Sequence, residues 1–84
     1  MLDIVYTLVL EVRDQPGVLV RVAQVFARRG SNISSVHVEH PANTSWSRMT
    51  ITVKNVARID QITSQLEKLI DVHQVSVTTT TKES

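Results

Sequence analysis

The chain has 84 residues, of which 42% are hydrophobic, 20% are charged and none is cysteine, and its formal net charge at neutral pH is +1. At this size only about 60% of the unfolded surface is buried on folding, so we expect one small domain that a partner chain or a ligand would stabilise further. The low charge excludes the basic surface typical of nucleic-acid binders, and the lack of cysteine excludes disulfides and thiolate zinc sites.

The first residues of the chain, 1–7, contain neither a basic segment nor a long apolar run. They therefore predict no secretory signal and no membrane span, and we expect a cytoplasmic location. We expect a single domain over residues 1–80, followed by a polar tail over residues 81–84.

The first half of the chain predicts a strand followed by a helix. Residues 4–13 alternate between one wholly apolar face and one mixed face, as in a central strand with one buried side. Residues 17–29 repeat apolar side chains at helical spacing, namely Leu19, Val22, Ala23 and Phe26. Asp14 is a suitable N-cap for this helix, and Gly30 suits the left-handed position just beyond its end.

The second half of the chain predicts three strands and a second helix. Residues 32–40 and 46–54 alternate as strands, and their connection is too long for a two-residue hairpin turn. Residues 56–70 carry an apolar stripe at every third or fourth position, which predicts a helix capped by Asn55. A last strand is expected over residues 73–79, with a frayed polar end.

The predicted order of elements is β-α-β-β-α-β. Because each helix has one apolar stripe, both helices must cover the same face of the sheet. The sequence therefore predicts an α+β, ferredoxin-like fold with a four-stranded antiparallel sheet and two helices on one face. The other sheet face is expected to be polar and to meet water, with Thr7, Val9, Glu11, His37, Glu39, Arg48, Thr50, Thr52, Ser76 and Thr78 on it.

This fold hosts many functions, so individual residues must decide among them. RNA-binding proteins of this topology stack bases on aromatic side chains of the central strands, which here offer Tyr6 at most. His37 and Glu39 alone are too few ligands for a metal, and Glu11 and Glu39 would need an enclosing pocket to act in catalysis. We therefore predict no catalytic residues, no metal and no cofactor bound by this chain.

Two loops at opposite ends of the first helix remain as candidate binding elements, although each alone is equally well explained as a helix start or stop. Backbone N–H groups at Gly17, Val18 and Leu19 suit a carboxylate. The Asp14 carboxylate suits an ammonium, and Asn32 offers both a donor and an acceptor. The helix ends are roughly 20 Å apart at 1.5 Å per residue. One small ligand therefore contacts both loops only if they come from two subunits.

Four segments carry a resemblance to a known family: 12–19 (Val-Arg-Asp-Gln-Pro-Gly-Val-Leu), 26–33 (Phe-Ala-Arg-Arg-Gly-Ser-Asn-Ile), 47–51 (Ser-Arg-Met-Thr-Ile) and 65–72 (Gln-Leu-Glu-Lys-Leu-Ile-Asp-Val). Over residues 4–78 the chain resembles an ACT domain. The second and third segments together are most similar to the small regulatory subunits of acetohydroxyacid synthase (acetolactate synthase).

The resemblance implies a non-catalytic subunit that activates a thiamine-diphosphate-dependent catalytic subunit and confers feedback inhibition by a branched-chain amino acid, usually valine. It also implies a homodimer of ACT domains side by side, with the effector at their interface. By motif position, the effector contacts divide between two chains: Asp14, Gly17, Val18 and Leu19 of one, and Asn32 and Ile33 of the other. Family members often have asparagine at the position of Asp14, and longer members carry a second domain. The alternative is an ACT-like dimeric adaptor or regulatory module that binds another amino acid or no ligand.

Overall fold

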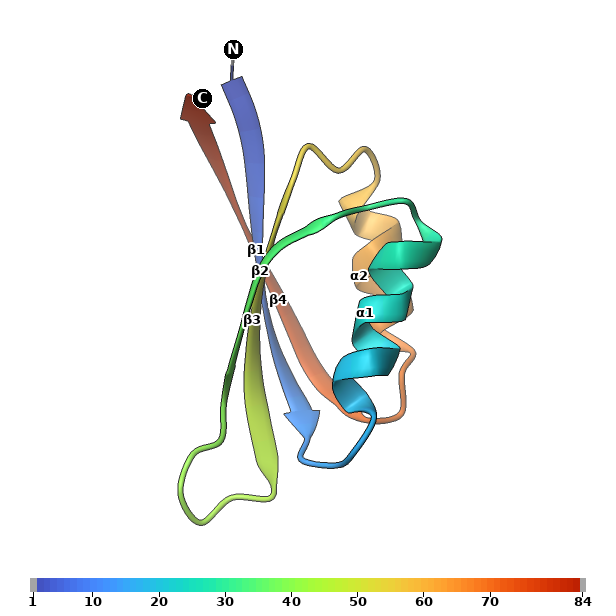
Figure 1. Cartoon of the computed structure of the whole chain (residues 1–84), viewed down its shortest axis with the longest axis vertical. Coiled ribbons are helices and arrows are strands. Elements are labelled where there is room, and N and C mark those ends of the chain that lie inside the picture. Colours follow the sequence, from blue (N-terminus) through green and yellow to red (C-terminus); the bar gives the residue numbers. More distant parts are fainter. Residues whose placement is uncertain (1, 84) are drawn as a thin grey trace.

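Six elements follow one another along the chain: β1 (Leu2–Arg13), α1 (Val18–Arg28), β2 (Ile33–Glu39), β3 (Trp46–Lys54), α2 (Ile59–Glu67) and β4 (Val72–Glu83). The structure is a computed structural model that describes residues 2–83. The strands form one sheet in the order β2-β3-β1-β4, and each neighbouring pair is antiparallel. Figure 1 shows both helices on the same side of this sheet, which confirms the predicted ferredoxin-like fold.

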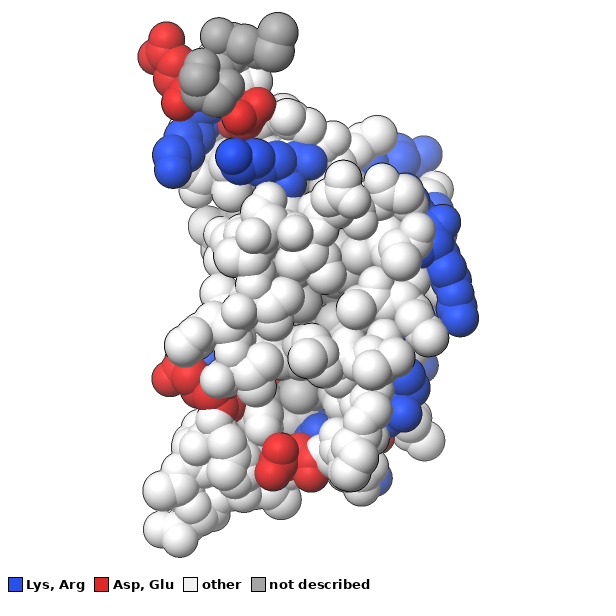
Figure 2. All heavy atoms as spheres, viewed as in Figure 1, with Lys and Arg blue, Asp and Glu red and all other residues white. Residues whose placement is uncertain are grey.

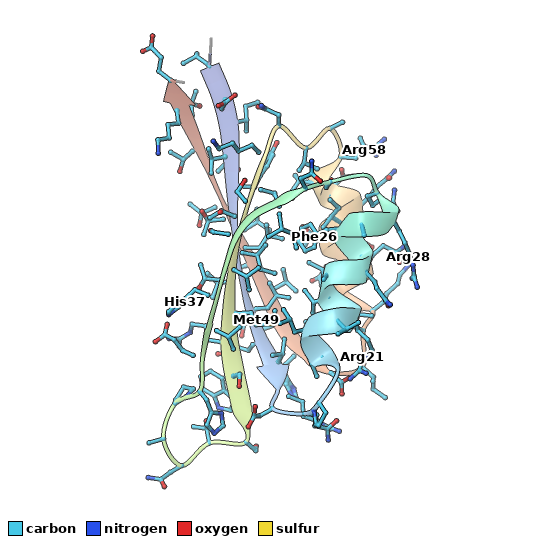
Figure 3. The ribbon with its side chains drawn as sticks, viewed as in Figure 1. Arg21, Phe26, Arg28, His37, Met49 and Arg58 are labelled. Atoms are coloured by element: carbon cyan, nitrogen blue, oxygen red, sulfur yellow. The ribbon has the colours of Figure 1, made fainter. Side chains whose placement is uncertain are left out.

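The core lies between the sheet and the helices, because the apolar faces of these elements meet there. Phe26 points from α1 toward the sheet, where Met49 of β3 also lies (Figure 3). The largest fully buried side chains come from β1, β3 and both helices: Phe26, Leu8, Leu10, Met49, Ile51, Ile62, Leu66, Val22 and Val53. Burying one such side chain contributes about 1.5–3 kcal/mol. The alternation of β1 and the stripe of α2 were therefore read correctly from the sequence.

The two strands at the chain ends are longer than predicted. β1 begins at Leu2, and β4 continues to Glu83, which lies opposite Leu2 in the antiparallel register. The frayed end expected from residue 78 onward is thus wrong as far as Glu83, because β1 supplies it with a row of hydrogen-bonding partners and threonine favours strands. The first and last residues of the predicted ranges, 1 and 84, lie outside the described residues.

α1 begins one residue later than predicted and is capped differently. Its N-cap is Gly17, whose φ of +84° lies in the left-handed region that favours glycine. The prediction that Asp14 caps this helix was wrong, because that carboxylate accepts a hydrogen bond from β3 instead. The buried stripe differs as well: Val18 is buried, whereas Leu19, expected in the core, is 50% exposed.

α2 is shorter than predicted, and its expected cap has another role. The helix begins at Ile59 with Arg58 as N-cap, so the assignment of Asn55 to that position was wrong. Asn55 has a positive φ of 54°, and its Oδ1 accepts the N–H of Ile4 at 2.9 Å. The Asn55 side chain thus joins the end of β3 to the start of β1, since a side-chain amide competes well for backbone groups in turns.

Candidate ligand-binding site

A cavity of about 280 Å³ lies where β1 leads into α1. It is bordered by β1 and the following turn, the start of α1, and β2 and β3; its lining residues are Val12, Arg13, Asp14, Gln15, Val18, Leu19, Val38, Ser47 and Met49. Most of this wall is apolar, and Asp14 supplies a carboxylate. Apolar cavities with a few converging polar groups are the usual form of a small-molecule site.

The turn between β1 and α1 is held to its neighbours by backbone hydrogen bonds. The N–H of Arg13 donates to the carbonyl of Asp71 at 2.7 Å, and the N–H of Asp14 donates to the carbonyl of Ser45 at 3.1 Å. The N–H of Val18 donates to the carbonyl of Gln15 over a longer 3.4 Å, within the turn itself. The start of α1 is therefore fixed in place, with the positive end of its dipole beside the cavity.

Arg21 adds a cation to the start of α1. A Cβ atom built on Gly17 would lie 3.0 Å from Nη1 of Arg21, so the guanidinium covers the N-cap. Nη2 of Arg21 donates to Oδ2 of Asp71, whose side chain is only 8% exposed. Figure 3 shows Arg21 near the end of α1 where the helix begins. A ligand carboxylate at this end would therefore meet both a helix N-terminus and an arginine.

Asp14 lies in a cluster with Ser47 and His40 that the sequence did not reveal. Ser47 Oγ donates to Asp14 Oδ1 at 3.2 Å, and His40 Nδ1 lies 3.4 Å from Asp14 Oδ2 and 3.3 Å from Ser47 Oγ. Residue types of a catalytic triad meet here, but the serine hydroxyl donates directly to the carboxylate, whereas in a triad the histidine lies between the serine and the carboxylate. The cluster depends on the β1–β3 register, in which Val12 lies opposite Ser47.

A second cavity, of about 520 Å³, lies at the other end of α1. It is lined by residues of the α1–β2 and β3–α2 connections and their flanks: Arg29, Gly30, Ser31, Asn32, Ser34, Lys54, Asn55, Val56 and Ala57. Gly30 has the predicted positive φ, 68°. Asn32 lines this cavity together with the cationic side chains of Arg29 and Lys54. The neighbouring Ile33 is half-buried against the core.

The predicted site residues thus fall into two groups. Asp14, Val18 and Leu19 line the first cavity, with Gly17 capping α1 beside it, and Asn32 lines the second. α1 has 11 residues and is about 16 Å long at 1.5 Å per residue. Within one chain the two groups lie apart, which agrees with the separation predicted from the length of the helix.

Other candidate chemistry lies on the open sheet face. His37 Nε2 is 3.7 Å from Glu39 Oε1, as the alternation of β2 predicts, and both side chains are exposed. Among residues 2–83 no group of three histidine, cysteine, aspartate or glutamate side chains gathers as a metal site would require. Neither helix in this part of the chain is long and apolar enough to cross a membrane.

A ferredoxin-like βαββαβ sheet with ligand-sized cavities at both ends of α1 defines the class of this protein, an ACT domain. The family model of the AHAS small subunit-like ACT domain matches residues 8–74, and the chain belongs to that family.

Relatives with known names agree with this assignment. The acetolactate synthase small subunit of Mycobacterium leprae is 48% identical over 71 residues, which are 83% of this chain and 42% of that protein. Its counterpart from Mycolicibacterium smegmatis is 46% identical over the same shares. The crystal structure of the acetolactate synthase small subunit from Thermotoga maritima superposes with a TM-score of 0.76 at 39% identity, over 87% of this chain and 46% of that one. The chain spans less than half the length of these relatives.

Proposed function

We propose that this chain senses an amino acid as part of a regulatory subunit of acetolactate synthase. In this proposal it is not catalytic and holds no cofactor. It binds and activates a thiamine-diphosphate-dependent catalytic subunit and confers feedback inhibition by a branched-chain amino acid, with valine as the first candidate. The observation that carries the proposal is the cavity of about 280 Å³ in which a largely apolar wall includes the Asp14 carboxylate.

Each group of a branched-chain amino acid has a counterpart in this cavity or beside it. The ligand ammonium would bind Asp14, since charge-assisted hydrogen bonds are the strong ones. The ligand carboxylate would lie at the start of α1 near Arg21. The aliphatic side chain would contact the apolar wall, which includes Val12, Val18 and Met49.

We propose that a second copy of the chain completes the site. Val36 and Val38 lie on the helix-covered face of the sheet, yet they are 41% and 49% exposed because β2 is an edge strand. Figure 2 views the molecule from the side of α1 and β2, and most of that surface is uncharged, with lysine and arginine mainly at its margins. An apolar edge of this kind favours association with another chain.

A two-fold pairing along this edge would also resolve the separation of the predicted residues. In a two-fold interface the same patch meets itself, so antiparallel α1 helices place the start of one helix near the end of the other. Asp14 of one copy then lies on the same side as Asn32 of the other. This dimer supplies both halves of the proposed effector site.

Titration calorimetry with valine, leucine and isoleucine tests the proposal. We expect heat with at least one of them, at one ligand per chain, and a higher melting temperature in its presence. Isovalerate, which lacks the ammonium, and isobutylamine, which lacks the carboxylate, serve as matched control ligands and are expected to bind far more weakly. An absence of heat and of any thermal shift with all three amino acids contradicts the proposal.

One observation favours a second candidate, a dimeric adaptor that activates its partner without sensing a ligand. Both oxygens of Asp14 already have partners within the chain, Ser47 and His40. Acetolactate formation by the cognate catalytic subunit, measured with this chain and with or without valine, separates the two candidates. Activation that valine does not reverse favours the adaptor.

A further inference from the structure

We infer that His40 is a positioning residue for Asp14 that makes effector binding depend on pH, with protonation of His40 weakening the hold on the effector ammonium. The inference rests on the proposed function, because it concerns the same site. It requires that His40 is fixed against Asp14, that its charge acts on this carboxylate, and that no other charged group takes over this role.

The connection between β2 and β3 fixes His40 in place. The Asp14 N–H donates to the carbonyl of Ser45 at 3.1 Å, which joins the connection to the β1–α1 turn. Thr44 Oγ1 lies 2.8 Å from the carbonyl of Pro41 and 3.0 Å from that of Trp46, so the connection is also bonded within itself. His40 lies between this bonded connection and Glu39, which pairs with Arg48 in the sheet, so the backbone of His40 is held on both sides.

The donors and acceptors of the cluster determine which nitrogen of His40 carries a proton. Ser47 Oγ donates its proton to Asp14 Oδ1, so toward His40 the serine oxygen acts only as an acceptor. Asp14 Oδ2 is likewise an acceptor, 3.4 Å from Nδ1. Nδ1 faces two acceptors and is therefore the donor, which assigns the exchangeable second proton to Nε2. When Nε2 gains that proton, the ring becomes a cation in contact with Asp14.

The other charged side chains of this region either have partners of their own or keep a constant charge. Glu39 is beside His37 on the open sheet face, and Arg48, its partner in the register, stacks over Trp46 with 5.7 Å between Cζ and the ring centroid. Arg13 lines the same cavity as Asp14 and carries a charge that does not change over this pH range. Asp14, from the β1–α1 turn, and Ser47, from β3, are thus the groups that face His40.

An imidazolium beside Asp14 competes with the effector for the same carboxylate. Histidine changes charge between about pH 5 and pH 8, whereas ligand ammonium groups and most carboxylates keep their charges there. Binding should therefore weaken as pH falls, by about threefold between pH 7.5 and pH 5.5, since both side chains are about half exposed and water screens the pair. By linkage, effector binding should release a fraction of a proton at intermediate pH.

Calorimetric titration of valine at pH 7.5, 6.5 and 5.5, in buffers of different ionisation enthalpy, measures both the affinity and the released protons. His40→Gln should flatten the pH profile and abolish the proton release. His37→Gln is the matched control, because His37 pairs with Glu39 on the open face, and it should behave as the wild type. Ser47→Ala should weaken binding at every pH while keeping the slope.

Two results would overturn the inference. If valine binds but the wild type and His40→Gln share one pH profile, His40 has no such role, and the proposed effector function still stands. If none of the three branched-chain amino acids produces heat at any pH, the effector function fails and this inference fails with it.

Discussion

The guanidinium of Arg21, near the start of α1, donates a hydrogen bond to the buried carboxylate of Asp71, in the loop between α2 and β4. This contact joins two segments 50 residues apart in the chain. The backbone carbonyl of Asp71 also accepts the N–H of Arg13. Asp71 therefore fixes both sides of the turn on which the proposed effector site is built.

Replacing Asp71 by asparagine should lower the free energy of unfolding by about 1–3 kcal/mol, since hydrogen bonds to charged groups contribute about that much. The value should lie below that of a fully buried pair, because Arg21 is 42% exposed. Urea unfolding followed by circular dichroism measures the change.

Asp60→Asn is the control for this prediction. The hydrogen bond from Arg58 lowers the pKa of the Asp60 carboxyl, so the pair stabilises the fold above the ordinary carboxyl pKa and stops doing so as pH falls through the lowered value. Both groups are exposed and water screens the pair, so at neutral pH we expect a smaller loss from Asp60→Asn than from Asp71→Asn. A larger loss from Asp60→Asn than from Asp71→Asn would contradict the assignment.

Gly17→Ala should lower stability and weaken effector binding. The left-handed φ costs a residue with a Cβ atom about 1–2 kcal/mol, and the new Cβ would lie 3.0 Å from Nη1 of Arg21, so the flexible guanidinium would have to shift slightly. Gly30→Ala shares the positive φ but has no atom within 4 Å of its Cβ, so it isolates the backbone cost. Thermal unfolding and valine titration of both variants test this, and unchanged binding in Gly17→Ala would place the anion site elsewhere. Gly17→Val should abolish the effector response, because its larger side chain would occupy the space beside the Arg21 guanidinium at the start of α1.

Asn32→Ala should weaken effector binding by about 0.5–1.5 kcal/mol, the usual net value of a hydrogen bond, with little effect on stability because Asn32 is exposed. A mixed dimer gives the sharper test. When Asp14→Ala and Asn32→Ala chains are combined, one of the two shared sites contains both substitutions and the other contains none. Calorimetry on the purified mixed dimer should then find half of its sites with wild-type affinity, whereas sites contained within one chain would all stay impaired.

Val38→Glu should convert the proposed dimer to folded monomers, because it places a charge on the apolar edge of β2. Val77→Glu is the matched control on the other edge strand, β4, where the exposed fraction is 38%. Sedimentation velocity distinguishes the two. Dissociation by Val77→Glu alone would place the interface on β4 instead.

Periodicity determined most of the fold. The predicted third strand, residues 46–54, coincides with β3. Alternation of apolar and polar side chains along a strand is a local property, so it can be read without knowing the neighbouring strands. The ends of elements depend on distant partners instead. β4 extends to Glu83 because it pairs with β1 along its whole length. Asn55 does not cap α2 because its side chain accepts the backbone N–H of Ile4.

The sequence by itself also determined which loops were candidates for binding, from a Pro-Gly turn and a Gly-Ser-Asn turn separated by one helix length. Only the tertiary structure decided what surrounds them. The β1–β3 register places Ser47 at Asp14, and the β2–β3 connection adds His40. These contacts join side chains 26 and 33 positions apart in the chain, and no local pattern in the sequence shows which distant residues strand pairing brings together.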